Sequence, residues 1–330
     1  SPAEWACLPI KAFDFFGRIY DAIEAGADWP KDVCTARAAF LAKTPEPFLD
    51  RLDYRILFIF KFPYRRFCVV RLSVLQPWVL KWQLPEMFAG VPGVGAEDAW
   101  WITAIILEHS RLHNIIFTGM CADILKCFDQ IVKPLLEAIL LIAGMPRQTV
   151  SAYMRFHENL LIYNQLAGGL GKPYRKRCSI PQGCPFSMMF IALMLFPWVC
   201  ICKEIGLQPR ILADDLLLTS VGNTHEQFEN FIVGCNKTHE YIHDMGAKAA
   251  PSKSFCFSTD TNYRDWLRNH TWINLGIRIV AKNAFRDLGS HLNLAASING
   301  STLTNRMLGI LGTIGRIAWL PHSTKQKIIF

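Results

Sequence analysis

The clearest pattern of hydrophobic and polar positions lies at residues 211–218, where two short apolar runs enclose an acidic pair, Asp214 and Asp215. Each run has the length of a strand, so the stretch predicts a β-hairpin with both carboxylates at its tip. Unpaired carboxylates are costly on an apolar strand. The pair is therefore either a solvated turn that breaks the strand or a site for a hard cation such as Mg²⁺.

Apolar residues at helical spacing predict a series of helices. The expected segments are residues 12–25, 65–82, 97–112, 130–143 and 148–158, with a final helical region at 302–319. Ser187 is expected to cap an apolar helix that runs to Lys203. Thr224 and Gln227 form a capping box for a further helix, which Gly246 ends.

Short apolar segments between glycines, prolines and polar residues predict the strands. They are residues 35–43, 54–60, 115–124 and 253–258, with two more strands within 272–292. Residues 160–167 and 174–180 are expected to form a hairpin through the glycines at 168–171, and residues 44–53 a loop. Strands and helices alternate without a regular βαβ repeat, which favours an α+β fold with inserted subdomains.

Composition narrows the class of protein. The 330 residues are 51% hydrophobic and 12% aromatic, which assures a sizeable core and excludes general disorder. The net charge of +8 is a moderate basic excess that fits a polyanionic partner. The eleven cysteines are scattered without zinc-ligand spacing, so they are interpreted as reduced thiols of an intracellular protein, nuclear or cytoplasmic.

The chain carries no recognisable signal peptide or transmembrane segment. It opens Ser1-Pro2 without a basic start. Its longest apolar run, residues 188–202, contains Pro197 and is shorter than the roughly twenty residues that span a bilayer, so a core helix is expected there rather than a membrane anchor. Both ends look like cuts in a longer protein.

A third carboxylate has a similar setting. Asp123 ends an apolar strand, as Asp214 does. If the two strands are neighbours, the acids fall within reach of a shared metal ion. Phosphoryl transfer by two metal ions needs such a cluster, because one ion activates the attacking hydroxyl and the other holds the leaving phosphates.

These residues sit in a series of motifs with a known order. Residues 122–129, Ala-Asp-Ile-Leu-Lys-Cys-Phe-Asp, resemble the first catalytic motif of reverse transcriptases from non-LTR (LINE-type) retrotransposons and group II introns. Residues 180–187, Ile-Pro-Gln-Gly-Cys-Pro-Phe-Ser, resemble the second motif, and 213–215 resemble the third. Residues 246–254 are similar to the fourth motif and 285–289 to the fifth, the primer grip.

The resemblance implies a right-hand polymerase and a division of the chain. Residues 1–112 would form an N-terminal extension and the fingers. Residues 113–290 would form the palm, with a fingers/palm insertion at 144–180, and residues 291–330 the start of a truncated helical thumb. The implied activity is RNA-templated DNA synthesis from dNTPs on a primer 3′-OH, as part of a retroelement polyprotein.

The resemblance also implies roles for the residues of this chain that stand at the functional positions of the family's motifs. Asp123 and Asp214 would hold two Mg²⁺ ions, or Mn²⁺, assisted by the Ile124 carbonyl and supported by Asp215. Lys253 would lie near the pyrophosphate and act as general acid. The remaining implied contacts are Lys43, Arg55, Gln182 and Gly183 to the dNTP, Leu288 and Gly289 to the primer end, and Arg175, Lys176 and Arg177 to the template or primer backbone.

The resemblance also implies that Phe128 selects the sugar. It lies five residues after Asp123, where reverse transcriptases place a bulky aromatic ring under the sugar. Such a ring would leave no room for a 2′-hydroxyl, which implies dNTP rather than rNTP as substrate. The alternative role of Phe128 is core packing, and Gln182 is alternatively a turn residue. The basic arm at 175–177 is alternatively solvated without a ligand.

Several positions depart from the family pattern. Leu212 stands where an aromatic residue usually precedes the Ala-Asp-Asp motif, Ile56 replaces a proline after Arg55, and Phe186 replaces a common leucine. No endonuclease domain or Cys/His knuckle is recognisable, so the chain is expected to be an excerpt of a longer retroelement protein or a decayed copy.

Three alternative functions are considered. One is an RNA-dependent RNA polymerase, which Phe128 argues against. Another is a non-catalytic nucleic-acid-binding relic, which the intact acids argue against, and a more remote one is a membrane protein.

Overall fold

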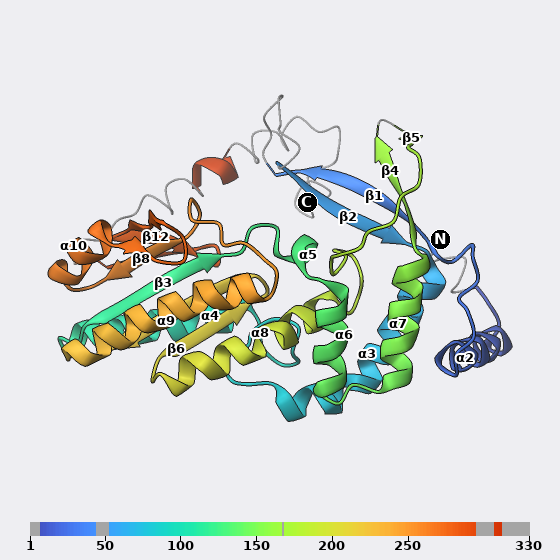
Figure 1. The fold of residues 1–330 in the computed structure, drawn as a ribbon, viewed down its shortest axis with the longest axis horizontal. Helices are drawn as coiled ribbons and strands as arrows, with labels where there is room; N and C mark the ends of the chain where they lie inside the picture. Colours follow the sequence, from blue (N-terminus) through green and yellow to red (C-terminus); the bar gives the residue numbers. More distant parts are fainter. Residues whose placement is uncertain (1–6, 44–52, 167, 295–306, 312–330) are drawn as a thin grey trace.

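The computed structural model describes residues 7–43, 53–166, 168–294 and 307–311 (Figure 1). Its strands form a five-stranded central sheet and a four-stranded outer sheet, with two short hairpins beside them. Helices pack against both larger sheets, so the predicted α+β class is confirmed.

Among the described residues, most helices lie close to the predicted segments, but Cys127–Gln130 and Thr261–Asn269 were not predicted. The described helices are Ile10–Glu24 (α2), Phe62–Trp82 (α3), Ala96–Leu112 (α4), Cys127–Gln130 (α5), Lys133–Ile142 (α6), Arg147–Asn159 (α7), Ser187–Glu204 (α8), His225–Asp244 (α9) and Thr261–Asn269 (α10). Residues 307–311 are also helical and fall within the region predicted at 302–319; the rest of that region lies outside the described residues.

The central sheet has the strand order β11-β8-β3-β7-β6. Its strands are Phe117–Asp123 (β3), Gln208–Leu212 (β6), Asp215–Val221 (β7), Phe255–Ser258 (β8) and Val280–Ala281 (β11). β3 lies in the middle and pairs antiparallel with β7 and β8. It is buried on both faces up to its last residue, which explains why its sequence is a continuous apolar run rather than an alternating one.

The two faces of the central sheet pack against different layers. Met120 on one face belongs to the main core, together with α8 and α9 (Figure 1). Phe117 and Phe257 on the other face form a second cluster with Leu107 of α4. The hairpin of β12 (Ala284–Asp287) and β13 (Ser290–Asn293) completes this second cluster. Gly119 is required between the strands, because a Cβ there would lie 2.2 Å from the Phe257 ring.

Helix α8 accounts for the long apolar run. It is long and apolar enough to cross a membrane by length and composition alone. Phe190, Leu195 and Trp198 are completely buried within the main core, and the Trp198 indole donates a hydrogen bond to Thr238 of α9 (3.0 Å). The helix therefore has the setting of a core helix.

The outer sheet has the order β2-β1-β4-β5. Its strands are Thr35–Ala42 (β1), Tyr54–Phe60 (β2), Leu161–Leu166 (β4) and Gly169–Leu170 (β5). β1 pairs antiparallel with β2 and parallel with β4, so segments about 120 residues apart in sequence share one sheet. Beneath this sheet, Tyr64 of α3 stacks on Phe156 of α7, and Trp29 packs edge-on against both rings. These contacts hold α3 against α7.

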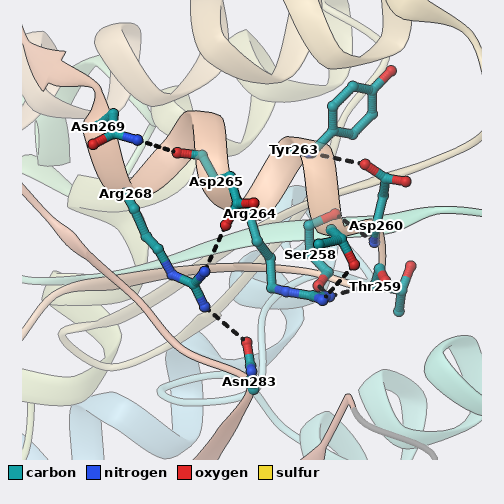
Figure 2. Close-up of polar contacts among 10 residues, drawn as sticks. Ser258, Thr259, Asp260, Tyr263, Arg264, Asp265, Arg268, Asn269 and Asn283 are labelled. Carbon is teal, nitrogen blue, oxygen red and sulfur yellow. Dashed lines mark hydrogen bonds and ion pairs between the residues drawn. The ribbon is translucent and has the colours of Figure 1, made fainter.

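The segment after β8 contains a helix that the sequence analysis did not predict. In α10, Asp260 caps the N-terminus by accepting a hydrogen bond from the Tyr263 backbone (2.8 Å), and Arg264 donates to the carbonyls of Ser258 and Thr259 (Figure 2). Tyr263 stacks on Phe228 of α9 with ring centroids 3.9 Å apart. The helix is short and polar overall, but Tyr263, Trp266 and Leu267 form one apolar face at helical spacing that packs against the rest of the protein.

Other details differ from prediction. Phe186, not Ser187, is the N-cap of α8, because the Ser187 hydroxyl donates to the carbonyls of Pro181 and Cys184. The return arm at 174–180 meets β4 only at one isolated bridge, between Tyr174 and Ile162, and its Cys178 bridges Val132 instead. The antiparallel strand that pairs with the end of β4 is β5. The region 272–292 holds more strands than two, namely β9 (Thr271–Trp272), β10 (Ile277–Arg278), β11, β12 and β13. Of the loop predicted at 44–53, residues 44–52 lie outside the described residues. The boundaries between fingers, palm and thumb at residues 112 and 290 stay predictions.

Candidate active site

Three carboxylates meet at one end of the central sheet. Asp123, the last residue of β3, is directly opposite Asp215, the first residue of β7, in the antiparallel ladder. Asp214 lies in the turn between β6 and β7, where Leu212 pairs with Asp215 and Ala213 has a φ of +57°. The predicted hairpin and the predicted adjacency of the two strands are therefore both confirmed.

The carboxylates open into a cavity of about 570 Å³. Its lining includes most of the residues implied by the motifs: Lys43, Arg55, Asp123, Ile124, Phe128, Gln182, Gly183, Asp214, Asp215 and Lys253. These residues come from both sheets, from the segment after β3 and from the loop before α8. The structure thus brings together parts of the chain that span more than two hundred residues.

The three carboxylates repel one another, which affects the pKa values of Asp123 and Asp215. Burial raises the pKa of Asp123; Lys253 counteracts this shift, whereas the negative charge of Asp214 adds to it. Burial raises the pKa of Asp215 to about 6. The negative charges of Asp287, Asp214 and Asp123 raise this pKa further, whereas the positive charge of Arg210 lowers it. A half-buried cluster of like charges is the arrangement that a bound cation relieves.

The donor atoms fit a hard divalent ion. The carbonyl of Asp123 accepts a hydrogen bond from Ala250 N, whereas the carbonyl of Ile124 accepts none from the residues that the structure describes. Carboxylates and a free carbonyl are the oxygen donors that Mg²⁺ takes, with water and phosphate filling the rest of its coordination. In the described part of the chain no three His, Cys, Asp or Glu side chains form a ready-made cage, so substrate oxygens would be needed as ligands.

Cations surround the same cavity. Lys253 Nζ lies 3.8 Å from Oδ1 of Asp123. Burial lowers the pKa of Lys43, and the charges of Lys253, Lys126 and Arg55 lower it further. Four cations thus share one cavity with four acids, because Asp129 also lines it. The sequence analysis missed Lys126, which lines the cavity in the left-handed conformation, with a φ of +45°.

The loop before α8 rests on the outer sheet. Phe58 N of β2 donates to the Gln182 carbonyl (2.8 Å). Gly183 has a φ of +109°, and a Cβ there would lie 2.4 Å from the Phe58 carbonyl oxygen. Only glycine fits this contact without displacing backbone. Phe128 is 8% exposed, and Ile180 N donates to its carbonyl, so its ring forms part of the cavity wall and of the core at once.

The other implied residues lie outside the cavity lining, as far as the described residues define it. Leu288 and Gly289 form the turn between β12 and β13. Arg175 and Arg177 are exposed. Lys176 is engaged within the protein, with Nζ 2.5 Å from Oδ1 of Asp129 and 5.1 Å from the centre of the Phe58 ring. A backbone contact by these residues stays a prediction.

Known proteins resemble this chain in structure. No protein-family model matches the sequence, and no curated protein matches it. Apo telomerase from Candida tropicalis, truncated from its C-terminal domain, matches over 80% of this chain and 54% of its own, with a TM-score of 0.56 at 10% identity. Telomerase from the same species in complex with a TWJ fragment of telomeric RNA matches over 86% and 47%, with a TM-score of 0.56 at 9% identity. The corresponding complex from Candida albicans matches over 81% and 47%, with a TM-score of 0.52 at 11% identity.

Telomerase is a reverse transcriptase, and its structures share the fold of this chain. The chain has a reverse-transcriptase-like polymerase fold, which confirms the right-hand class expected from the motifs. It spans about half the length of these telomerase chains.

Proposed function

We propose that the chain is the reverse transcriptase domain of a non-LTR retroelement protein and extends a primer 3′-OH with dNTPs opposite an RNA template. The observation that supports this most is the placement of Asp123 opposite Asp215, with Asp214 in the adjoining turn, in a cavity lined by several cations. Such a cavity suits a substrate that carries both a triphosphate and a metal ion. We expect the protein to act inside the cell, in the nucleus or cytoplasm, where an RNA template is present.

Each group of residues has a separate task in this proposal. Lys43, Arg55 and Lys126 neutralise the triphosphate, and Gln182 and Gly183 hold the nucleotide from the loop before α8. Phe128 excludes a 2′-hydroxyl from the sugar position. Lys253 donates a proton to the pyrophosphate as it leaves the α-phosphorus.

Asp123, Asp214 and the Ile124 carbonyl would hold two Mg²⁺ ions, with Asp215 beside them. When bound, such ions lower the pKa of the primer hydroxyl and stabilise the charge of the leaving pyrophosphate. Mn²⁺ has the same ligand preference and is expected to substitute.

The same comparison supports the proposed RNA template. Two of the telomerase structures are complexes with a fragment of telomeric RNA. The basic excess of this chain suits contact with phosphates, and A-form duplexes are held by phosphates and 2′-hydroxyls rather than by sequence.

The test is primer extension by purified protein on poly(rA) primed with oligo(dT), with dTTP or UTP, in Mg²⁺ or Mn²⁺. We expect dTTP incorporation that Asp123→Asn and Asp214→Asn each reduce at least about a hundredfold, with template–primer binding retained. Asp244→Asn, at an exposed position on α9, is the matched control. Preference for UTP would favour an RNA-dependent RNA polymerase. Tight binding without extension in either metal would favour a catalytically decayed relic.

A further inference from the structure

The motifs assign no role to the buried ion pair between Arg210 and Asp287, although Asp287 lies within residues 285–289, which resemble the fifth motif. Arg210 Nη1 lies 2.8 Å from Oδ2 of Asp287, and Nη2 lies 2.7 Å from Oδ1, so the guanidinium and the carboxylate meet as a two-pronged fork. The side chains are 6% and 1% exposed. The same Nη1 also donates to the Thr103 hydroxyl of α4 (2.7 Å). The pair therefore joins β6, β12 and α4.

One end of the pair belongs to the catalytic hairpin. In the β6–β7 ladder Leu212 is opposite Asp215, and Arg210 is opposite Leu217. Because side chains alternate across a strand, Arg210 and Asp215 project from the same face of the sheet and are diagonal neighbours. Arg210 is thus fixed relative to the carboxylates by two directly paired strands.

The other end belongs to the turn that resembles the primer grip. Asp287 ends β12 and directly precedes Leu288 and Gly289, whose φ angles are +46° and +90°. Two consecutive positive φ values make a tight hairpin turn, and a leucine in this conformation is held there by its surroundings. Phe285 secures the same hairpin from below by stacking on Phe257, with ring centroids 4.7 Å apart.

A buried ion pair is a poor source of stability, because desolvation of the two charges offsets much of their attraction. Its fork geometry instead restricts how two elements lie relative to each other. A hydrophobic contact such as Phe285 on Phe257 lets the β12–β13 hairpin shift relative to the central sheet. The two hydrogen bonds of the fork, in contrast, form in only one relative position of β12 and β6.

We propose that Arg210 and Asp287 are positioning residues that fix the Leu288–Gly289 turn, and with it the primer 3′ end, relative to Asp214 and Asp215. This inference rests on the proposed function, since it concerns the placement of a primer. Neither residue contacts the reacting atoms. Their effect is on the alignment of the attacking hydroxyl, for which a displacement of about 1 Å can cost about a hundredfold in rate.

The test replaces the pair by apolar residues of similar volume. Asp287→Asn alone leaves a buried unpaired guanidinium and is expected to impair folding, so the decisive variant is Arg210→Met with Asp287→Leu, which keeps the site filled. The matched control is Arg71→Met with Glu24→Leu. That pair is also forked, at 2.9 and 2.6 Å, but it is only partly buried and joins α3 and α2. It also contacts a threonine hydroxyl, which Thr149 here donates to Glu24.

Both double variants are expected to unfold at temperatures close to that of the parent protein and to bind template–primer and dNTP with unchanged affinity. The Arg210/Asp287 variant is expected to lose at least about tenfold in kcat, with the KM for dNTP within about twofold, and to alter the fluorescence of 2-aminopurine at the primer 3′ terminus. The Arg71/Glu24 variant is expected to change neither. A folded Arg210/Asp287 variant with the parent kcat and the parent fluorescence would overturn the inference while leaving the polymerase intact. Absence of extension by the parent protein would overturn the proposed function, and the inference with it.

Discussion

The ammonium nitrogen of Lys253 lies 3.8 Å from the Asp123 carboxylate, so a cation from the segment after α9 partly neutralises the acidic cluster. The Lys253 side chain is more than half exposed, and it lines the cavity. In the proposed reaction, the ammonium group of Lys253 would turn from the Asp123 carboxylate towards the negative charge that develops on the departing pyrophosphate. The geometry therefore suits a proton donor better than a purely structural ion pair.

Replacing Lys253 by glutamine tests this role. We expect kcat to fall about a hundredfold and the KM for dNTP to rise less than tenfold, because a general acid acts in the transition state and contributes little to ground-state binding. Steady-state extension with saturating template–primer and varied dNTP measures both constants. The control is Lys237→Gln on the exposed face of α9. An unchanged kcat in Lys253→Gln would remove this residue from the catalytic set.

The hairpin that carries Asp214 and Asp215 could be predicted from the sequence because everything that forms it is local. Two apolar runs, a turn and the register between them lie within residues 208–221. The adjacency of Asp123 needed the family motifs, since β3 precedes β7 by almost a hundred residues and no local pattern dictates that they pair.

Other parts of the site depend on contacts that leave no local trace. Arg210 and Asp287 are 77 residues apart, and each looks like an ordinary surface charge until the fold buries both. Lys126 reaches the cavity only because its backbone is left-handed. Strand β5 is two residues long and lies within residues 168–171, which were predicted as the turn, so the return arm was predicted too far along the chain.

Gly183 provides a test of the loop that holds the nucleotide. Gly183→Ala must place a Cβ 2.4 Å from the Phe58 carbonyl at a φ of +109°. We expect it to cost about 2 kcal/mol or more in free energy of unfolding and to raise the KM for dNTP by displacing Gln182. Urea denaturation and extension kinetics measure the two effects.

The control for this variant is Gly17→Ala in α2, where a Cβ meets nothing within 4 Å. Since alanine is the better helix former, this change is expected to stabilise the protein by about 0.5–1 kcal/mol without affecting extension. If Gly183→Ala were as stable as the parent and bound dNTP equally well, the loop would have room that the structure does not provide.

Phe128 provides a test of sugar selection. Phe128→Val removes most of the ring from the cavity wall while keeping an apolar side chain, so we expect UTP incorporation to rise relative to dTTP by about ten- to a hundredfold. The ratio of kcat/KM values for the two nucleotides is the proper measure, because a smaller folded fraction lowers both equally. Phe231→Val, which opens the buried core under α9, is the control. Equal ratios in Phe128→Val and the parent would assign the ring to core packing alone.

His157 provides a test of stability against pH. Its ring is buried beside Tyr64, with Nε2 2.8 Å from the Tyr64 hydroxyl, and Lys133 lies nearby. Burial, together with the charge of Lys133, lowers the pKa of His157 well below its ordinary value of 6.5. The unfolded chain therefore takes up a proton below about pH 6.5 that the folded protein does not, so this histidine's contribution to stability is complete above that pH and is lost as the pH falls.

His157→Gln removes the titrating group. We expect the variant to be less stable than the parent at about pH 7.5, because it loses ring contacts with Tyr153 and Phe156, and we expect the deficit to shrink by about 1.4 kcal/mol per pH unit below about pH 6. Urea unfolding at a series of pH values measures the difference, and the carboxylates cancel because both proteins share them. His225→Gln at the exposed start of α9 is expected to follow the parent. A deficit in His157→Gln that stayed constant from about pH 7.5 to 5 would show that His157 is protonated in the folded protein as readily as in the unfolded chain.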